Sequence, residues 1–237
     1  MTDHSHEPAD IHARISNPPG RGLLRDMIYG GIDGSVTTFA IVAGVAGAGL
    51  SPFIIVALGL ANVLADGFSM AAGNYSATKS ELDNARRLRK VEAAHIDRFP
   101  DGEREEVREI LRQKGLEGTV LEDATNAITA RRETWIDLMM EGEYGLSNVD
   151  PHPLRAAWAT FAAFMVAGLV PLLPFIFGMG EGAFTISAVM TMVVFFAIGA
   201  AKSIWSLAPW WYSALETLVI GGAAAGMAFG VGTLFHP

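Results

Sequence analysis

Long apolar runs and one densely charged block alternate along this chain of 237 residues. No residue from Val36 to Ala65 is charged, and residues 156–237 hold only three charged side chains, Glu181, Lys202 and Glu216. Between these runs, residues 79–155 hold 30 of the 42 charged residues. A membrane-spanning helix needs about 20 mostly apolar residues, and the runs are at least that long. The pattern therefore predicts a membrane protein with a polar module between its spans.

Breaks in the apolar runs divide them into five spans. The charge-free run of residues 36–65 would form a helix of about 45 Å, which is too long for one span. Gly47, Gly49 and Pro52 supply the break, because glycine ends helices and proline starts them. Gly- and Pro-containing turns separate the later spans in the same way. The predicted spans are residues 26–48, 52–75, 157–178, 184–203 and 210–235.

The basic residues indicate the orientation of these spans. Three arginines precede the first span, the charged block follows the second, and Lys202 ends the fourth. The loops near Leu50 and Glu181, which lie on the other side, carry neither Lys nor Arg. Lys and Arg concentrate in cytoplasmic loops. The N-terminus and the charged block should therefore be cytoplasmic, and the C-terminus should lie on the opposite side of the membrane.

The predicted fold class is an all-α membrane protein with five transmembrane helices and a cytoplasmic three-helix module inserted between spans 2 and 3. Residues 1–25 are polar, lack the apolar core of a signal peptide, and are expected to be a disordered cytoplasmic tail. Spans 1 and 2 fall in residues 26–78, the polar module in 79–152, and spans 3–5 in 153–237. The module helices are expected over residues 78–96, which continue span 2, and over 103–114 and 121–140.

Residue types that bind metal ions recur in the polar module at helical spacing. Side chains three or four residues apart share a helix face. The set comprises Glu92, His95, Glu103, Glu106, Met139, Met140 and Glu143. The chain has no Cys, and carboxylate, imidazole and thioether donors suit Fe(II), Mn(II), Co(II) or Zn(II). A single acidic pair is common on a solvated helix, and a single pair of methionines is common in a core. The prediction of a metal site therefore depends on all of these residues occurring together.

Polar side chains also interrupt the first two spans. Asp33 is followed by a glycine in span 1, and Asn62, Asp66 and Met70 follow one another at intervals of four in span 2. Ionisable residues inside a membrane are costly and usually functional. A carboxylate and a thioether on facing helices would make a transient Fe(II) site that also exchanges protons. A buried, hydrogen-bonded Asp is the structural alternative.

These residues together resemble the vacuolar iron transporter family over residues 25–235. The motifs that carry the resemblance are Ile32-Asp-Gly-Ser-Val-Thr-Thr-Phe39, Ala65-Asp-Gly-Phe-Ser-Met-Ala-Ala-Gly-Asn-Tyr75, Lys114-Gly-Leu116, Trp135-x-x-x-Met-Met-x-x-Glu143 and Pro171-Leu-Leu-Pro-Phe175. The resemblance implies a homodimeric antiporter with its path at the subunit interface. It also implies proton-coupled export of Fe(II) from the cytoplasm, with Mn, Co and Zn as further candidate ions, and neither enzymatic activity nor a prosthetic group.

The resemblance also assigns residues to roles. The family's module ligands fall on Glu92, Glu103, Glu106, Met139, Met140 and Glu143, and its path residues on Asp33 and Met70. Two positions depart from familiar relatives, which carry Glu where His95 stands and often where Asn62 stands. Imidazole would shift the metal preference. Because Asn62 cannot carry a proton, Asp66, one turn further on, would supply that charge.

Two other functions fit the same residues. One is a membrane-anchored metal buffer or sensor, and the other is a di-iron ferroxidase, although di-iron bundles use two Glu-x-x-His elements where this chain has one. The net charge of −8 gives no support to nucleic-acid binding. The short tail without organelle-targeting features favours a bacterial inner membrane.

Overall fold

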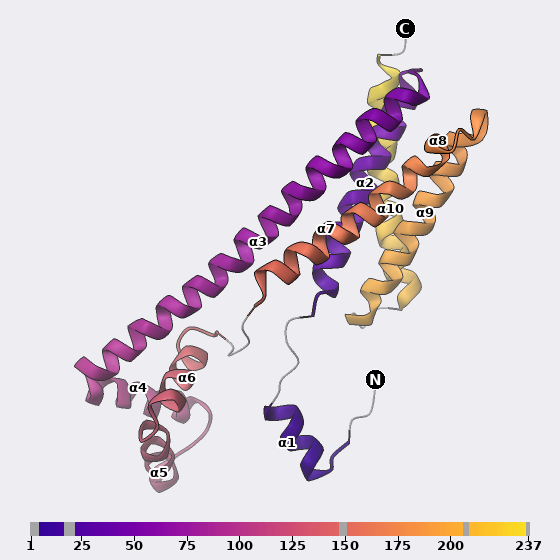
Figure 1. Cartoon of the computed structure of the whole chain (residues 1–237). Coiled ribbons are helices and arrows are strands. Elements are labelled where there is room, and N and C mark those ends of the chain that lie inside the picture. The colour runs from indigo at the N-terminus through magenta and orange to yellow at the C-terminus, as the bar shows by residue number, and fades with distance from the viewer. Residues whose placement is uncertain (1–4, 17–21, 147–150, 206–208, 236–237) are drawn as a thin grey trace. The chain divides into compact units, whose positions relative to one another are not determined.

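The described regular structure of the protein is entirely helical (Figure 1). The structure is a computed structural model, and it describes residues 5–16, 22–146, 151–205 and 209–235. The chain divides into two compact units, one of residues 1–21 and 78–151 and the other of residues 22–77 and 152–237. Helix α3 (Pro52–Arg98) contributes to both units. The predicted all-α class is confirmed for the residues that are described.

Five helical segments of the described chain are long and apolar enough to cross a membrane, as predicted. The first is α2 (Leu24–Gly47) and the second is the N-terminal part of α3. The third joins α7 (Pro153–Leu169), η1 (Val170–Leu172) and α8 (Leu173–Ile176). The fourth joins η2 (Gly180–Gly182) to α9 (Ala183–Lys202), which η3 (Ser203–Trp205) follows, and the fifth is α10 (Trp210–Thr233).

Glycine and proline lie at the ends of these helices, at the predicted break after Gly47 and also at Pro171, inside the span predicted over residues 157–178, where no break was predicted. Gly49 follows α2 with a φ of 68°, a left-handed conformation that glycine adopts at little cost. Pro171 lies where α7 gives way to η1, because proline has no N–H to continue the helical hydrogen bonds. Of the break predicted between the fourth and fifth spans, residues 206–208 lie outside the described part of the chain.

Glycines also let the membrane-type helices approach closely. α2 packs along α7 and α10, and a Cβ on Gly34 would lie 2.5 Å from the carbonyl oxygen of Phe164 in α7. Only a residue without a side chain fits such a crossing. A buried apolar cluster next to it joins α2, α3 and η1 through Phe39, Val42, Val45, Ile55, Val63 and Leu172.

In the other unit, α3 continues to Arg98 as predicted, and α4 (Pro100–Gln113) follows after a one-residue break. The single helix expected over residues 121–140 is wrong, because this stretch forms α5 (Gly118–Thr129) and α6 (Arg132–Gly142). Arg131 between them is extended, with φ −120° and ψ 103°. The hydroxyls of Thr125 and Thr129 donate to carbonyl oxygens four residues back, at 2.8 and 2.9 Å, a pattern that bends helices.

The expected disorder of residues 1–25 needs a second correction. Residues 8–16 form α1 (Pro8–Ser16), with Pro8 at its start, Asp10 in its first turn and Arg14 in its last turn. Acidic residues near a helix N-terminus and basic residues near its C-terminus stabilise the helix dipole. None of its residues is buried. Residues 1–4 and 17–21 of the tail lie outside the described part of the chain.

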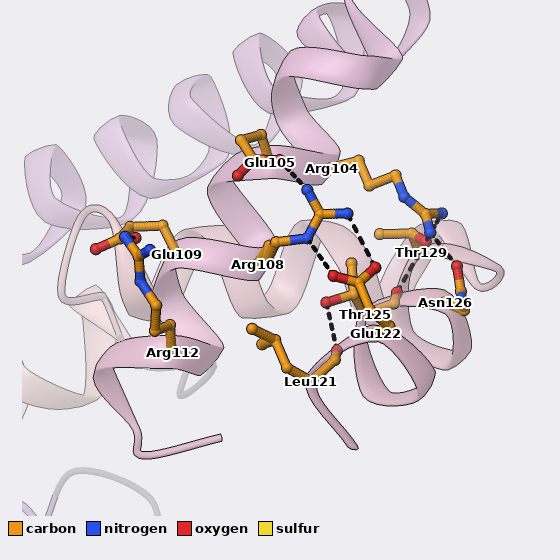
Figure 2. Close-up of polar contacts among 10 residues, drawn as sticks. All are labelled: Arg104, Glu105, Arg108, Glu109, Arg112, Leu121, Glu122, Thr125, Asn126 and Thr129. Carbon is orange, nitrogen blue, oxygen red and sulfur yellow. Dashed lines mark hydrogen bonds and ion pairs between the residues drawn. The ribbon is translucent and has the colours of Figure 1, made fainter. Parts of the chain in front are cut away.

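A compact hydrophobic core holds the helices of the polar module together. Its buried residues are Ile96, Val107, Leu111, Leu121, Trp135, Ile136, Met139 and Met140. Ion pairs tie the surfaces of the same helices. Figure 2 shows how Arg108 of α4 donates from Nε and Nη2 to both carboxylate oxygens of Glu122 in α5, at 2.8 and 3.0 Å. Arg89 similarly joins α3 to Glu133 and Asp137 of α6.

Candidate metal site

Three of the predicted metal ligands converge where α3 meets α4. Glu92, His95 and Glu103 each offer one donor atom, and these atoms lie within 4.8 Å of one another. Nδ1 of His95 is 3.4 Å from Oε1 of Glu103 and 3.9 Å from Oε1 of Glu92. Phe99 brings the two helices together, because its N–H donates to the carbonyl of His95 while its own carbonyl accepts from the N–H of Glu103.

The two carboxylates of this group are buried. Glu92 is 0% exposed and Glu103 is 5% exposed, whereas the imidazole of His95 reaches solvent. Oε2 of Glu92 and Oε2 of Glu103 are buried without a hydrogen-bond partner among the described residues. Burying a carboxylate without a partner is costly, and such groups are normally paired or coordinate a metal ion. The two unpartnered oxygen atoms are therefore available to a cation.

Basic side chains of the module are engaged elsewhere. Among the described residues, no Lys or Arg forms an ion pair with Glu92, Glu103, Glu106 or Glu143. Four arginines bind other acids instead, in the pairs Arg89–Asp137, Arg132–Asp97, Arg108–Glu122 and Arg112–Glu109, the last two of which appear in Figure 2. The site thus keeps its negative charge, which attracts a divalent cation.

The neighbouring carboxylates act on one another through their charge. Burial, followed by the charges of Glu106 and Glu92, raises the pKa of Glu103 to about 7. Burial and the charges of Glu92 and Glu106 also raise the pKa of Glu143. Glu106 and Glu143 are exposed, and they lie close enough to add to the field at the buried pair. A bound cation would relieve this repulsion.

The predicted thioether ligands occupy a different environment. Met139 and Met140 are 0% and 5% exposed and belong to the hydrophobic core of the module. Tyr144, which the sequence did not single out, donates from its hydroxyl to Oε1 of Glu92 at 2.7 Å. No helical spacing connects Tyr144 to Glu92, because the two are 52 residues apart in sequence.

The polar residues of the first two spans also meet across α2 and α3. Asn62 donates from Nδ2 to Oγ1 of Thr37 at 3.4 Å, and Asp33 and Asp66 lie near enough to repel each other. Met70 is half-buried one turn after Asp66. The four predicted path residues therefore lie along a helix pair that is long and apolar enough to span a membrane.

Asn74, one turn after Met70, continues this row of polar residues. Its Nδ2 lies 3.0 Å from Oδ1 of Asp26 and 2.7 Å from Oγ1 of Thr160. Asp26 was not among the predicted path residues, although its position seven residues before Asp33 places both on one face of α2.

These features define a helical protein with apolar membrane-type spans, a candidate divalent-cation site in a polar module, and a row of carboxylate, amide and thioether groups within two of the spans. A family model described as the VIT family matches residues 24–233. The chain belongs to the VIT family.

Relatives from distant organisms share most of the chain. It is 38% identical to vacuolar iron transporter 1 of Eucalyptus grandis over 211 residues, which are 88% of this chain and 85% of that protein. It is 37% identical to vacuolar iron transporter 1 of Arabidopsis thaliana over 209 residues, 87% of this chain and 84% of that protein. The vacuolar iron transporter of Toxoplasma gondii is 32% identical over 224 residues, 90% of this chain and 74% of that protein.

Family membership confirms the predicted resemblance and the assignment to ion transport rather than to enzymatic catalysis. The relatives are named as iron transporters, and the chain has the apolar helices that a membrane protein requires.

Proposed function

We propose that this protein exports Fe(II) from the cytoplasm across a membrane in exchange for protons. The polar module binds the ion, and residues of α2 and α3 carry it through the spans. The observation that carries the proposal is the buried pair Glu92 and Glu103 beside His95, with one oxygen of each carboxylate unpartnered. Membership of a family whose relatives are named as iron transporters supports it.

The Glu92–His95–Glu103 group gives the site its chemical preference. Two carboxylates and one imidazole suit borderline divalent ions, of which Fe(II) is the first candidate and Mn, Co and Zn are others. Glu106 and Glu143 add charge at the exposed side and complete the binding region. The thioethers of Met139 and Met140 are also proposed as ligands. Because both side chains are buried in the core of the module, the core must rearrange before they can contact the ion.

Exchange with protons follows from the same carboxylates. Because the pKa of Glu103 is raised to about 7, a metal ion that binds there near neutral pH displaces a proton from part of the population. In the spans, Asp33 of α2 and Asp66 of α3 supply two further carboxyl groups for the ion. Metal ions and protons therefore compete for the same groups, which is the requirement for coupled exchange.

The orientation and assembly are also part of the proposal. The distribution of Lys and Arg supports a cytoplasmic N-terminus and module, with the C-terminus on the other side. The family resemblance supports a homodimer whose path lies at the subunit interface. The sequence favours a bacterial inner membrane, whereas the relatives are named as vacuolar iron transporters.

Uptake of Fe(II) into sealed proteoliposomes under an imposed pH gradient tests the function. We expect wild-type protein to carry the ion, Asp33→Ala to abolish uptake, and Glu92→Gln to raise the half-saturating Fe(II) concentration without abolishing the maximal rate. Asp123→Asn is the matched control, because Asp123 is exposed on α5 and should leave both values unchanged. If Asp33→Ala took up Fe(II) at the wild-type rate, Asp33 would not belong to the transport path.

The same experiment separates the rival functions. A membrane-anchored buffer or sensor would bind Fe(II) but give no flux in any variant. A ferroxidase would consume oxygen as Fe(II) is oxidised, and Glu92→Gln would slow that oxidation. Either result would replace transport as the function of the protein.

A further inference from the structure

The Tyr144 hydroxyl makes a direct contact with the most buried ligand of the metal site. It donates to Oε1 of Glu92 at 2.7 Å, while Oε2 of the same carboxylate has no hydrogen-bond partner among the described residues. Each carboxylate oxygen has two lone pairs, so Oε1 can accept this hydrogen bond and still face a cation. The contact thus fixes the carboxylate without occupying all of its ligand positions.

We propose that Tyr144 is a positioning residue of the metal site, holding the Glu92 carboxylate in one orientation for a divalent cation. This inference rests on the proposed function, in which the module binds that cation. Hydrogen-bond partners of metal ligands commonly orient the ligand and tune its affinity. Here the partner comes from the turn that follows α6, whereas Glu92 belongs to α3, so the contact also attaches this turn to α3.

The choice of a phenol matters for the charge of the site. An Arg or Lys at this point would form an ion pair with Glu92, cancel its charge and repel an incoming cation. A neutral hydroxyl orients the carboxylate and leaves its charge in place. Burial and the hydrogen bond to Glu92 raise the pKa of Tyr144 above its ordinary value, so the hydroxyl keeps its proton and remains a donor at neutral pH.

The backbone and the core hold Tyr144 in place. Its ring packs against the hydrophobic core of the module. Gly145 has a φ of 65°, and the N–H of Leu146 donates to the carbonyl of Met140 at 2.9 Å. A left-handed glycine with such a hydrogen bond is a common helix C-terminal motif. α6 is itself attached to α3 by Arg89, which pairs with Asp137 at 2.5 Å. Tyr144 is therefore a rigid donor rather than a mobile surface residue.

Binding of Co(II) to the purified full-length protein tests the inference, because the visible spectrum of Co(II) reports both affinity and ligand geometry. Tyr144→Phe keeps the ring and removes the hydroxyl, and we expect Co(II) to bind about ten- to a hundredfold more weakly, with an altered spectrum at saturation. Tyr144→Leu should bind no more weakly than Tyr144→Phe. Tyr212→Phe, an exposed tyrosine of α10, is the control and should match wild type.

Uptake in liposomes supplies a second readout that a purely structural role would not give. Tyr144→Phe should raise the half-saturating metal concentration by a similar factor and leave the maximal rate unchanged. Equal binding by Tyr144→Phe and wild type would overturn the inference and leave transport intact. Tighter binding by Tyr144→Phe would also overturn it, because the hydroxyl would then compete with the metal. An absence of Co(II) binding to the wild type would overturn the proposed function as well.

Discussion

Burial of Glu103, together with the negative charges of Glu106 and Glu92, should make the metal-free protein less stable when Glu103 ionises. The pKa of Glu103 is about 7 in the folded module, against an ordinary value of 4.5. A carboxyl group whose pKa is raised on folding favours the folded state at low pH, and this contribution is lost as the pH rises through 7. At about 1.4 kcal/mol for each pH unit between the two values, the loss is roughly 3 kcal/mol.

Glu103→Gln removes the ionisation and almost preserves the shape of the side chain. At pH 8, where wild-type Glu103 is ionised, the metal-free variant should be more stable than wild type by up to about 3 kcal/mol. This difference equals the stability that the wild type loses when Glu103 ionises. At pH 4.5 the two should agree within about 0.5 kcal/mol, because the wild-type side chain is then protonated in the folded state. The same substitution removes a metal ligand, so the stabilised variant should bind Co(II) more weakly.

Hydrogen–deuterium exchange of peptides from α4 measures the local opening of the helix that carries Glu103. Comparing variant with wild type at one pH cancels the intrinsic pH dependence of exchange. Slower exchange in Glu103→Gln at pH 8, with no difference at pH 4.5, is the expected result. Equal exchange of variant and wild type at both pH values, or wild-type protection that increases from pH 4.5 to pH 8, would refute the assigned cost of ionising Glu103.

Three further predictions concern selectivity, packing and orientation. His95→Glu should lower the preference for Zn(II) over Mn(II) about tenfold in competition binding, because it replaces nitrogen with oxygen; an unchanged ratio would exclude His95 as a ligand. Gly34→Ala should destabilise the spans by about 1–3 kcal/mol in detergent unfolding, whereas Gly73→Ala, with open space around it, should not; equal midpoints would contradict the close packing of α2 and α7. A membrane-impermeant maleimide outside intact cells should label Glu181→Cys but not Asp123→Cys in this cysteine-free chain, and the opposite labelling would reverse the proposed orientation.

The five spans could be predicted because a membrane helix needs a long apolar run, and that requirement is visible in the sequence without tertiary information. The continuation of α3 into the polar module was also predictable, since residues 78–96 contain neither Gly nor Pro. The break at Arg131 was not, because no glycine or proline marks it. That break lets Trp135 and Ile136 enter the core of the module, a tertiary requirement that local propensity does not report.

Part of the candidate site could likewise be predicted from sequence spacing, and part depends on tertiary packing. Glu92 and His95 share a helix face by spacing alone, so their proximity was predictable. Their meeting with Glu103 depends on the turn at Phe99, which lies between the helices predicted over residues 78–96 and 103–114. Tyr144 could not be found by spacing, because its contact with Glu92 depends on how α6 packs against α3. The burial of Met139 and Met140 in the core is likewise a product of packing.

Simultaneous recording of metal and proton movement in sealed liposomes tests the central claim most directly. The protein is reconstituted with a metal-sensitive dye and a pH-sensitive dye inside the vesicles, and Fe(II) is added outside under anaerobic conditions. We expect Fe(II) to enter as protons leave, a pH gradient with an acidic interior to accelerate entry, and Asp33→Ala to show neither movement. Vesicles that remain impermeable to Fe(II) under every proton gradient, although the purified protein binds the ion, would contradict the central claim.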